Sequence, residues 1–465
     1  MHNEKIIRRF LIAVIALLAI TFPAFLPHAE ESTSPALAVQ GTADQQALVD
    51  PLLQSEFDTA KVTMRGFAVE SAAEYKRIKD YHNSLVGDEA VVHSFTNQDG
   101  DFLVCVDIFR QPSLRDAGLG KSAATLEPTT LPGEDKSAPR ALAPQARALP
   151  GSQWLDGSLD ESGSLRKCPA DTYPKLAPRL ETLVRHKTLE DFYRKTPVDN
   201  QTTDGKLSGP LAVAPVHEYA HAYKNVNSIG QGADFNIWQP YTEKSTEFSL
   251  SQLWCVRGSG SALQTVELGW QVYAAKYGNY RPRLFIYFTT NGYTATGNYK
   301  GCYNLDCKGF VQTNSSIVVG STLSPVSKVG GTQYTSTLDA WRDPGTGHWW
   351  IRYNGAWLGY YPTTLYASSG LKPYSARIDF GGEIIDDKIG GHTATDMGSG
   401  YFPQAGFRKA AFTKKIHYWN TANKYYNATG LIRGVTNSYY YDLILYNYAT
   451  DANWKVSFYF GGPGR

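Results

Sequence analysis

Five consecutive residues, HEYAH, carry the pattern H-E-x-x-H from His217 to His221. In zinc proteases this pattern lies on a helix, where residues four apart stand one above the other and share one ion. Here Pro215 precedes the motif by two residues, and the run LAVAPVHEYAHAY alternates with period two. That alternation predicts a strand, on which four residues span about 13 Å, too far for two imidazoles on one zinc. We therefore expect ordinary strand histidines and no metal or other cofactor, with an HExxH zinc metalloprotease as the less favoured alternative.

Two glutamates occupy similar positions in other strand-like runs, Glu267 in TVELGWQVY and Glu383 in RIDFGGEII. In each run the large apolar residues share one face, so the glutamate points to the opposite face. Small neighbours, with Gly381 and Gly382 as substrate-binding candidates, would let a bound chain approach the backbone. Two carboxyls that meet across a concave sheet push their pKa values apart, which leaves one as base and one as acid. Gln271, on the same face as Glu267, is a candidate amide for the substrate or the oxyanion.

The elements that must hold these residues are short strands. From about residue 210 onward, alternating runs recur between Gly, Asn and Pro residues, and nine of the ten tryptophans lie from Trp238 onward. About a dozen such runs with no long helix between them predict an antiparallel sandwich or closed barrel. We expect an all-β domain over 210–465, an antiparallel β-sandwich of jelly-roll type.

The chain before this domain has a different texture. A helical run followed by two strands predicts a small α+β unit over 39–112. Residues 113–150 are rich in Pro, Ala, Ser and Thr and read as a linker or exposed loop. A second part over 151–209 contains a helical stretch at 176–193 and ends in the polar run TPVDNQTTDGKLSG.

The first 38 residues predict a secretory signal peptide. Lys5, Arg8 and Arg9 precede an unbroken apolar run over 10–20, and small-residue sites follow it. About eleven apolar residues fall short of the roughly twenty that a membrane-spanning helix needs. No later segment resembles a span. We expect an exported protein, extracellular or periplasmic in transit, with no stable membrane association.

Composition narrows the classes of partner. The net charge is +2, from 45 Lys and Arg against 43 Asp and Glu, which gives no basic field for a phosphate backbone. Nucleic acid is therefore excluded as an expected partner. Charged residues are 19%, below the roughly 25% of ordinary soluble domains, while aromatics reach 13%. This balance favours an extracellular, strand-rich protein over a helical bundle.

Five cysteines suit an exported protein with one or two bridges. Cys302 and Cys307 bracket YNLD and are predicted to close a short disulfide loop, with a metal half-site as the poorer alternative because no second cysteine pair follows. Cys105 and Cys168 would then pair upstream. That leaves Cys255 as a buried free thiol.

Seven ordered blocks between 210 and 465 resemble the neprosin-type glutamic peptidases. They are FSLSQLW, VELGWQVY, RLFIYFTTNGY, TGNYKGCYNLDCKGFVQTN, GHWWIRYN with LGYYP, FGGEI and DMGSGYFP. Upstream, FLVCVDIFRQPSL and CPADTYP are similar to the activation peptide of that family. The segment 113–150 and Cys255 are not explained by the resemblance.

The resemblance implies a β-sandwich with a concave cleft, a two-glutamate mechanism without metal, cleavage after proline, and an acid-activated zymogen. Carried over by motif, the catalytic residues fall on Glu267 of ELGW and Glu383 of GGEI. Protein or peptide substrates containing proline are the expected partners. The activation peptide would be held by charged residues whose carboxylate pairs weaken in acid, namely Arg179, Glu181, Arg185, Glu190 and Asp191.

Two other classes share some of these features. A glycosidase on a jelly-roll sandwich also uses two carboxylates, flanked by Trp and Tyr platforms for sugar rings. A carbohydrate-binding β-sandwich would use the aromatic surface without an acid pair. Assays on peptide and on polysaccharide separate the three.

Overall fold

The computed structural model describes residues 50–87, 90–116, 125–134, 155–195, 216–388, 390–448 and 450–465. The predicted signal peptide and the polar run over 196–209 lie outside these ranges. The described residues belong to one compact unit. Within them, no helix combines the length and the apolar character that crossing a bilayer requires.

The described residues from 50 to 195, which we call the N-terminal unit, combine helices with a small antiparallel sheet of order β1-β2-β3. Helix α2 begins after Ser71, whose side chain accepts a hydrogen bond from the backbone N–H of Glu74 as an N-cap. The predicted helical stretch over 176–193 is instead two short helices that follow β3. The elements are α1 (Pro51–Thr63), α2 (Ala72–Val86), β1 (Val91–Thr96), β2 (Phe102–Asp107), η1 (Ile108–Arg110), α3 (Pro112–Asp116), β3 (Thr172–Leu176), α4 (Leu180–Leu183) and α5 (Leu189–Tyr193).

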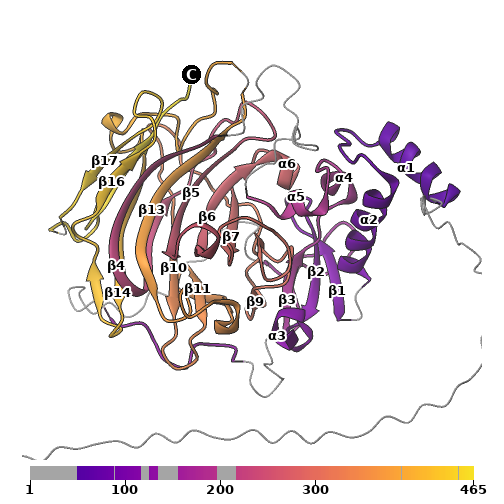
Figure 1. The fold of residues 1–465 in the computed structure, drawn as a ribbon, viewed down its shortest axis with the longest axis horizontal. Coiled ribbons are helices and arrows are strands. Elements are labelled where there is room, and N and C mark those ends of the chain that lie inside the picture. Colours follow the sequence, from indigo (N-terminus) through magenta and orange to yellow (C-terminus); the bar gives the residue numbers. More distant parts are fainter. Residues whose placement is uncertain are drawn as a thin grey trace, which may run out of the picture. The chain divides into compact units, whose positions relative to one another are not determined.

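Residues 216–465, which we call the sheet domain, form one curled antiparallel sheet of 15 strands among the residues described (Figure 1). Its main path runs β8-β7-β6-β5-β13-β4-β10-β11-β12-β9, and β14 to β18 attach through β4 and β14. The strands are β4 (Val216–Asn236), β5 (Phe248–Arg257), β6 (Gln264–Tyr273), β7 (Arg283–Thr289), β8 (Gly301–Tyr303), β9 (Val311–Gln312), β10 (Thr335–Arg342), β11 (Trp349–Tyr353), β12 (Ala356–Tyr361), β13 (Ser375–Asp386), β14 (Ala411–Asn420), β15 (Tyr425–Asn427), β16 (Ile432–Val435), β17 (Asp442–Tyr446) and β18 (Ser457–Gly461). Short helical turns lie between them: η2 (Gly260–Ala262), α6 (Ala274–Tyr277), η3 (Thr363–Leu365) and η4 (Pro403–Ala405).

Strand β4 is 21 residues long and connects two parts of this sheet. Its first half pairs with β13 and β16, and its second half pairs with β10 and β14. At Gly232 in the second half, an added Cβ would lie 1.9 Å from an oxygen of Asp339, so no larger residue fits without a shift. Because β4 belongs to both parts, strand pairing does not separate the domain into two sheets. The mostly-β antiparallel class is confirmed, whereas the sandwich is not distinguished.

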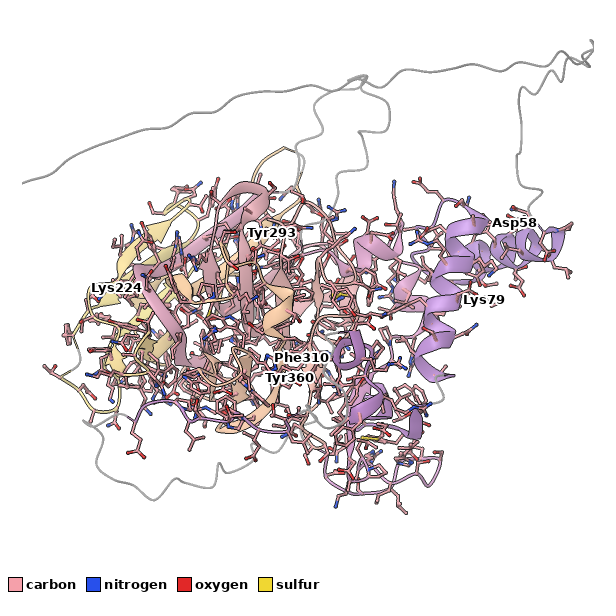
Figure 2. All side chains as sticks on the ribbon, turned by 60° about the horizontal axis from the view of Figure 1, so that its bottom comes forward. Asp58, Lys79, Lys224, Tyr293, Phe310 and Tyr360 are labelled. Carbon is pink, nitrogen blue, oxygen red and sulfur yellow. A yellow bond between two sulfur atoms is a disulfide. The ribbon has the colours of Figure 1, made fainter. Side chains whose placement is uncertain are left out.

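Alternate residues of the central strands build the core. In β13, Ile378, Phe380 and Ile384 are fully buried among other apolar side chains, as their period-two pattern predicts. Phe310 and Tyr360, labelled in Figure 2, are buried as well.

Both predicted disulfides are present. Cys105 on β2 bonds to Cys168, and Cys302 on β8 bonds to Cys307. Cys255 is a free, fully buried thiol, and its burial raises its pKa.

The N-terminal unit contacts the sheet domain beside β6 to β8, where α4 packs near α6 and α5 near β8 (Figure 1). Ion pairs cross this junction, among them Asp99 with Arg281, Asp101 with Arg283 and Asp116 with Lys308. Glu190 and Asp191, two of the charged residues expected to hold the unit in place, form ion pairs with Arg77 and Arg194 of the same unit. A cavity of about 350 Å³ lies at the junction, and neither Glu267 nor Glu383 lines it.

Part of the predicted linker lies against the sheet domain. Residues 125–134, which we call the strap, contact two turns of that domain. Thr129 and Thr130 donate hydrogen bonds from their hydroxyls to Asp343, at 2.7 and 2.6 Å. The carboxylate of Asp343 therefore anchors the strap to the sheet domain. This anchor of the N-terminal unit lies outside its small sheet, β1 to β3.

The second anchor of the strap is Gly133. Its N–H donates to Asn423 at 3.1 Å, and its carbonyl accepts from the indole of Trp419 at 2.8 Å. A Cβ at this position would lie 2.0 Å from the carbonyl oxygen of Asn423. Only glycine fits here without a shift.

Candidate active site

Glu267 on β6 and Glu383 on β13 point to the same face of the sheet from strands that flank β5. In the register, Gln252 of β5 lies opposite Gly269 of β6 and opposite Gly381 of β13. Glu267 and Glu383 stand two residues to either side of this row. The row itself places only one long side chain, Gln252, between them. The two glutamates can therefore lean toward each other across β5.

The glycines of this row are required by close approach of the strands. A Cβ on Gly269 would lie 2.0 Å from the carbonyl oxygen of Ser251, and one on Gly381 would lie 2.5 Å from that of Ala220. Any side chain at either position would displace a neighbouring backbone.

Lys195, the last described residue of the N-terminal unit, reaches both carboxylates. Its Nζ lies 2.6 Å from Oε2 of Glu267 and 2.8 Å from Oε2 of Glu383. Its side chain is 6% exposed and the two carboxylates are 1% exposed each, so this ion triad is closed to solvent. Burial lowers the pKa of Lys195, but the charges of Glu267 and Glu383 outweigh burial and raise it overall.

Glu267 is otherwise held by neutral hydroxyl donors. The hydroxyl of Thr265 donates to Oε1 at 2.8 Å, and that of Tyr293 donates to the same oxygen at 2.5 Å. Burial and the charge of Glu267 together raise the pKa of Tyr293 well above its usual value. Tyr293 therefore stays neutral and donates a hydrogen bond to Glu267.

Glu383 has a different set of partners. Nδ1 of His217 lies 2.5 Å from Oε1, and the amide of Gln252 donates to Oε2 at 2.8 Å. Burial raises the pKa of Glu383, but the Lys195 ammonium and the bond to His217 outweigh it and lower the pKa to about 2. Glu383 is thus ionised over almost the whole pH range in this arrangement.

A second histidine–carboxylate pair lies further along the same face. Nδ1 of His221 is 2.7 Å from Oδ1 of Asp379, and the imidazole stacks on the indole of Trp254 at 5.8 Å between ring centres. Burial raises the pKa of Asp379, opposed by His221 and Arg377. Both histidines of HEYAH thus bind carboxylates of β13.

The structure treats the predicted site residues differently. Glu267 and Glu383 converge, but they are 0% and 1% exposed and not solvated, because the end of the N-terminal unit covers them. Gln271 is fully buried, and its side-chain amide donates to the hydroxyl of Tyr303 and to neither glutamate. Gly382 faces the core, where a Cβ would lie 2.5 Å from the ring of Phe460.

Several residues that contact the glutamates escaped the sequence reasoning, namely Gln252, Thr265, Tyr293 and Lys195. Gln252 sits in the quoted block FSLSQLW, and only the register of β5 shows that it, and not Gln271, is the amide between the glutamates. Tyr293 follows the turn signal TTNG, and its φ of 62° turns its side chain back toward the strands. Lys195 carries no local signal.

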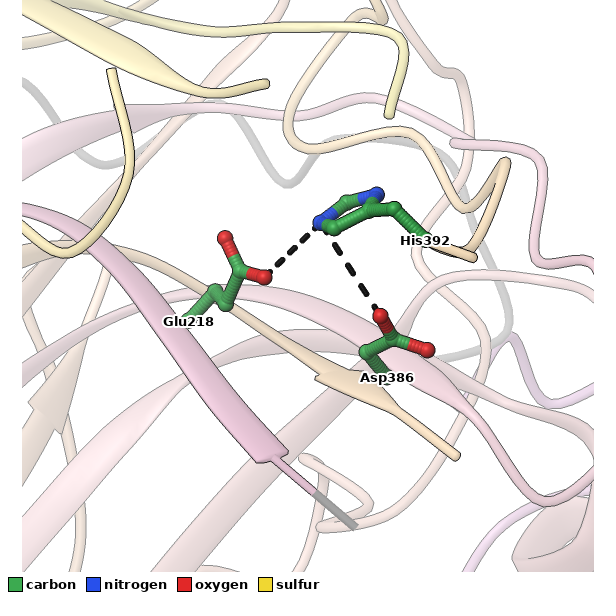
Figure 3. A group of neighbouring side chains, drawn as sticks. All are labelled: Glu218, Asp386 and His392. Carbon is green, nitrogen blue, oxygen red and sulfur yellow. Dashed lines mark hydrogen bonds and ion pairs between the residues drawn. The ribbon is translucent and has the colours of Figure 1, made fainter. Parts of the chain in front are cut away.

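Glu218, the second residue of HEYAH, faces the other side of β4 and belongs to a separate cluster (Figure 3). Nε2 of His392 lies 2.7 Å from Glu218 and 4.0 Å from Asp386, and its Nδ1 faces the carbonyl oxygen of Thr393 at 2.8 Å. Both ring nitrogens thus face oxygen atoms. Within the described ranges this is the one such trio with donor atoms within 4.8 Å of one another.

Neither histidine of HEYAH stands in a helix, because β4 is a strand throughout. The prediction of strand histidines is confirmed.

The family model of Neprosin matches residues 245–463. Two solved structures of Scytalido-glutamic peptidase, with a peptide-based transition-state analogue and with a transition-state analogue inhibitor, are 8% identical to this chain. They cover 53% of it and 97% and 98% of their own chains, with TM-scores of 0.27 and 0.29. A structure of SCP-B, a member of the Eqolisin family of peptidases in a complex with the tripeptide Ala-Ile-His, is 9% identical. It covers 54% of this chain and 100% of its own, with a TM-score of 0.25. Scores this low support no argument about this chain.

Proposed function

Because this chain carries a neprosin domain over residues 245–463, we propose that it is a glutamic endopeptidase, exported and made as a zymogen, with Glu267 and Glu383 as its catalytic pair. One observation carries the proposal. A single lysine of the N-terminal unit binds both carboxylates that the family motifs single out. An acid pair closed by a cation from an upstream segment is what an inactive precursor of a two-carboxylate enzyme requires.

The two carboxylates lie close together, because one ammonium reaches them at 2.6 and 2.8 Å. Two carboxylates so close cannot both ionise easily, so removal of Lys195 leaves them sharing a proton. The ionised glutamate takes a proton from a water molecule, whose oxygen attacks the scissile carbonyl carbon. The protonated glutamate donates a hydrogen bond to the carbonyl oxygen as negative charge develops there. When the tetrahedral intermediate collapses, a proton passes to the leaving nitrogen and the C–N bond breaks.

Acid supports the release of the lysine. The pKa of Glu383 is about 2 in the folded chain against an ordinary 4.5. Its pairing therefore stabilises the closed form fully above pH 4.5, and this stabilisation is lost as the pH falls toward 2. The proposed cut lies between 196 and 215, where Pro197 and Pro210 offer post-proline bonds.

Export and proline preference are further parts of the proposal. Export is supported by the signal-peptide pattern over 1–38 and by two disulfides, which persist in oxidising compartments. Preference for proline is supported by the family motifs. An antiparallel sandwich with a concave cleft belongs to the same proposal.

The test uses purified full-length protein shifted to about pH 3, the lower part of the window in which the pairing of Glu383 is lost. It receives a proline-containing peptide, the same peptide with alanine in place of proline, and a polysaccharide. Products are identified by mass spectrometry, and the new N-terminus of the protein is sequenced. Glu267→Gln is treated in parallel.

Cleavage after proline, with a new N-terminus between 196 and 215 in the wild type only, supports the proposal. An unprocessed and fully active wild-type chain rejects the zymogen. Hydrolysis of the polysaccharide and not of the peptides rejects the peptidase and favours the glycosidase.

A further inference from the structure

The first histidine of HEYAH is bonded to a proposed catalytic carboxylate. His217 lies on β4 and Glu383 on the neighbouring β13, with Nδ1 2.5 Å from Oε1. The imidazole is 18% exposed and is fixed by a stacked contact with Tyr219 and an edge contact with Phe248. The ring is thus held in one orientation by packing, with Nδ1 directed at the carboxylate.

The two glutamates differ in the kind of partner that remains when Lys195 leaves. Glu267 keeps two hydroxyl donors, Thr265 and Tyr293, which are neutral. Glu383 keeps the amide of Gln252 and the imidazole of His217, whose contact from Nδ1 and whose charge both lower the pKa of Glu383. An opposite charge within about 4–6 Å favours the ionised form of a carboxylate and lowers its pKa.

Other titratable groups also face Glu383. They are Lys195 from the N-terminal unit, Tyr219 of β4 and Glu267 of β6. Tyr219 remains neutral, because burial and the charge of Glu383 raise its pKa well above the usual value. Once Lys195 has gone, His217 is the one member of this set that can carry a positive charge.

Resting on the proposed peptidase function, we propose that His217 is a positioning residue that orients Glu383 and keeps it ionised in the activated enzyme, so that Glu383 acts as the base and Glu267 as the acid. His217 does this through the bond from Nδ1 to Glu383. Loss of that bond disfavours the ionised form of Glu383. The acidic limb of the pH–rate profile then moves to higher pH.

Two substitutions separate positioning from packing. His217→Phe keeps a ring for the contacts with Tyr219 and Phe248 but cannot donate to Glu383. His217→Asn loses the ring but keeps an N–H at a similar position. His221→Phe is the matched control, because the same change four residues along β4 removes a bond to Asp379 and not to Glu383.

All variants are made in the full chain, activated in acid, and checked by near-UV circular dichroism. The pH dependence of kcat/KM is then measured. We expect the acidic limb of His217→Phe to move up by about one pH unit, the lower end of shifts caused by a nearby charge, with activity at the most acidic pH reduced about tenfold. His217→Asn, which keeps a donor but not the charge, should move the limb by less than His217→Phe, and His221→Phe should keep the wild-type limb.

A limb that does not move in folded His217→Phe, or that moves equally in His221→Phe, overturns the inference. A larger shift in His217→Asn than in His217→Phe also overturns it, because the limb would then depend on the packing of the ring and not on the donor to Glu383. If His217→Phe does not fold, His217→Leu is judged by the same criterion. An inactive wild type, or an active Glu383→Gln, refutes the proposed function itself. If activity requires Glu383 but the acidic limb is the same in His217→Phe and in the wild type, only the role of His217 is refuted.

Discussion

Replacing Lys195 by methionine is expected to destabilise the full-length chain at neutral pH and to have much less effect in strong acid. Methionine keeps the length of the side chain but removes the ammonium that bonds to Glu267 and Glu383. Two buried carboxylates then face each other without this cation. They must either protonate or remain as uncompensated charges, and both outcomes cost folding free energy.

The magnitude follows from Glu383. Burial raises its pKa, yet Lys195, with His217, lowers it from 4.5 to about 2. Such a lowering corresponds to about 3 kcal/mol of stability at pH 7. Removing one partner of a buried ion pair typically costs 3–5 kcal/mol. We therefore expect Lys195→Met to lower the free energy of unfolding by about 3 kcal/mol at pH 7. Because the stabilisation is present above pH 4.5 and disappears toward pH 2, the difference should shrink in that window.

The assay is urea unfolding followed by tryptophan fluorescence at pH 7 and about pH 3, in chains that also carry Pro197→Ala and Pro210→Ala to block the proposed cut, with intact mass confirming an uncut chain. Lys187→Met is the matched control, since the ammonium of Lys187 pairs with Glu70 through side chains that are 30% and 71% exposed. Exposed pairs contribute about 0–1 kcal/mol. The reasoning is refuted if Lys195→Met is no less stable than this control at pH 7, or if its loss is the same at both pH values.

Three more outcomes are expected. Glu267→Gln and Glu383→Gln should each reduce peptide hydrolysis at least about a hundredfold while the chain stays folded, because each fixes one protonation state; near-normal activity in either folded variant contradicts the mechanism. Hydrolysis should peak in acid, survive a chelator and persist in folded His221→Ala; loss in EDTA that zinc restores would revive the HExxH reading. Gly133→Ala should detach the strap and speed its cleavage by an added protease, since a Cβ would lie 2.0 Å from the carbonyl oxygen of Asn423. The control is Leu131→Ala in the same strap, because the side chain of Leu131 is 70% exposed. Equal cleavage rates in both variants would argue against the anchor.

Some properties of the site depend only on local chain geometry and were readable from the sequence. The period-two alternation in TVELGWQVY and RIDFGGEII places Glu267 and Glu383 opposite the apolar face, because side chains of a strand alternate. The same rule puts HEYAH on a strand, as β4 confirms. The short spacing of Cys302 and Cys307 indicated their disulfide.

Other properties depend on which strands become neighbours, and only the tertiary structure decided these. Gln271 shares the face of Glu267, yet its amide bonds to Tyr303, while Gln252 of the intervening strand reaches Glu383. Local alternation fixes a face but not the register or the order of strands in the sheet.

Lys195 shows the same limit most clearly. Nothing in the sequence around it distinguishes it from the other lysines, because its role comes from two carboxylates that are distant in the chain and adjacent only after folding. The ionised state of Glu383 and the closure of the site depend on that contact. The sequence by itself therefore determined the types of the reacting residues and the faces they occupy. The three-dimensional arrangement decided their partners and their charge, because electrostatic interactions depend on distance in space and on burial.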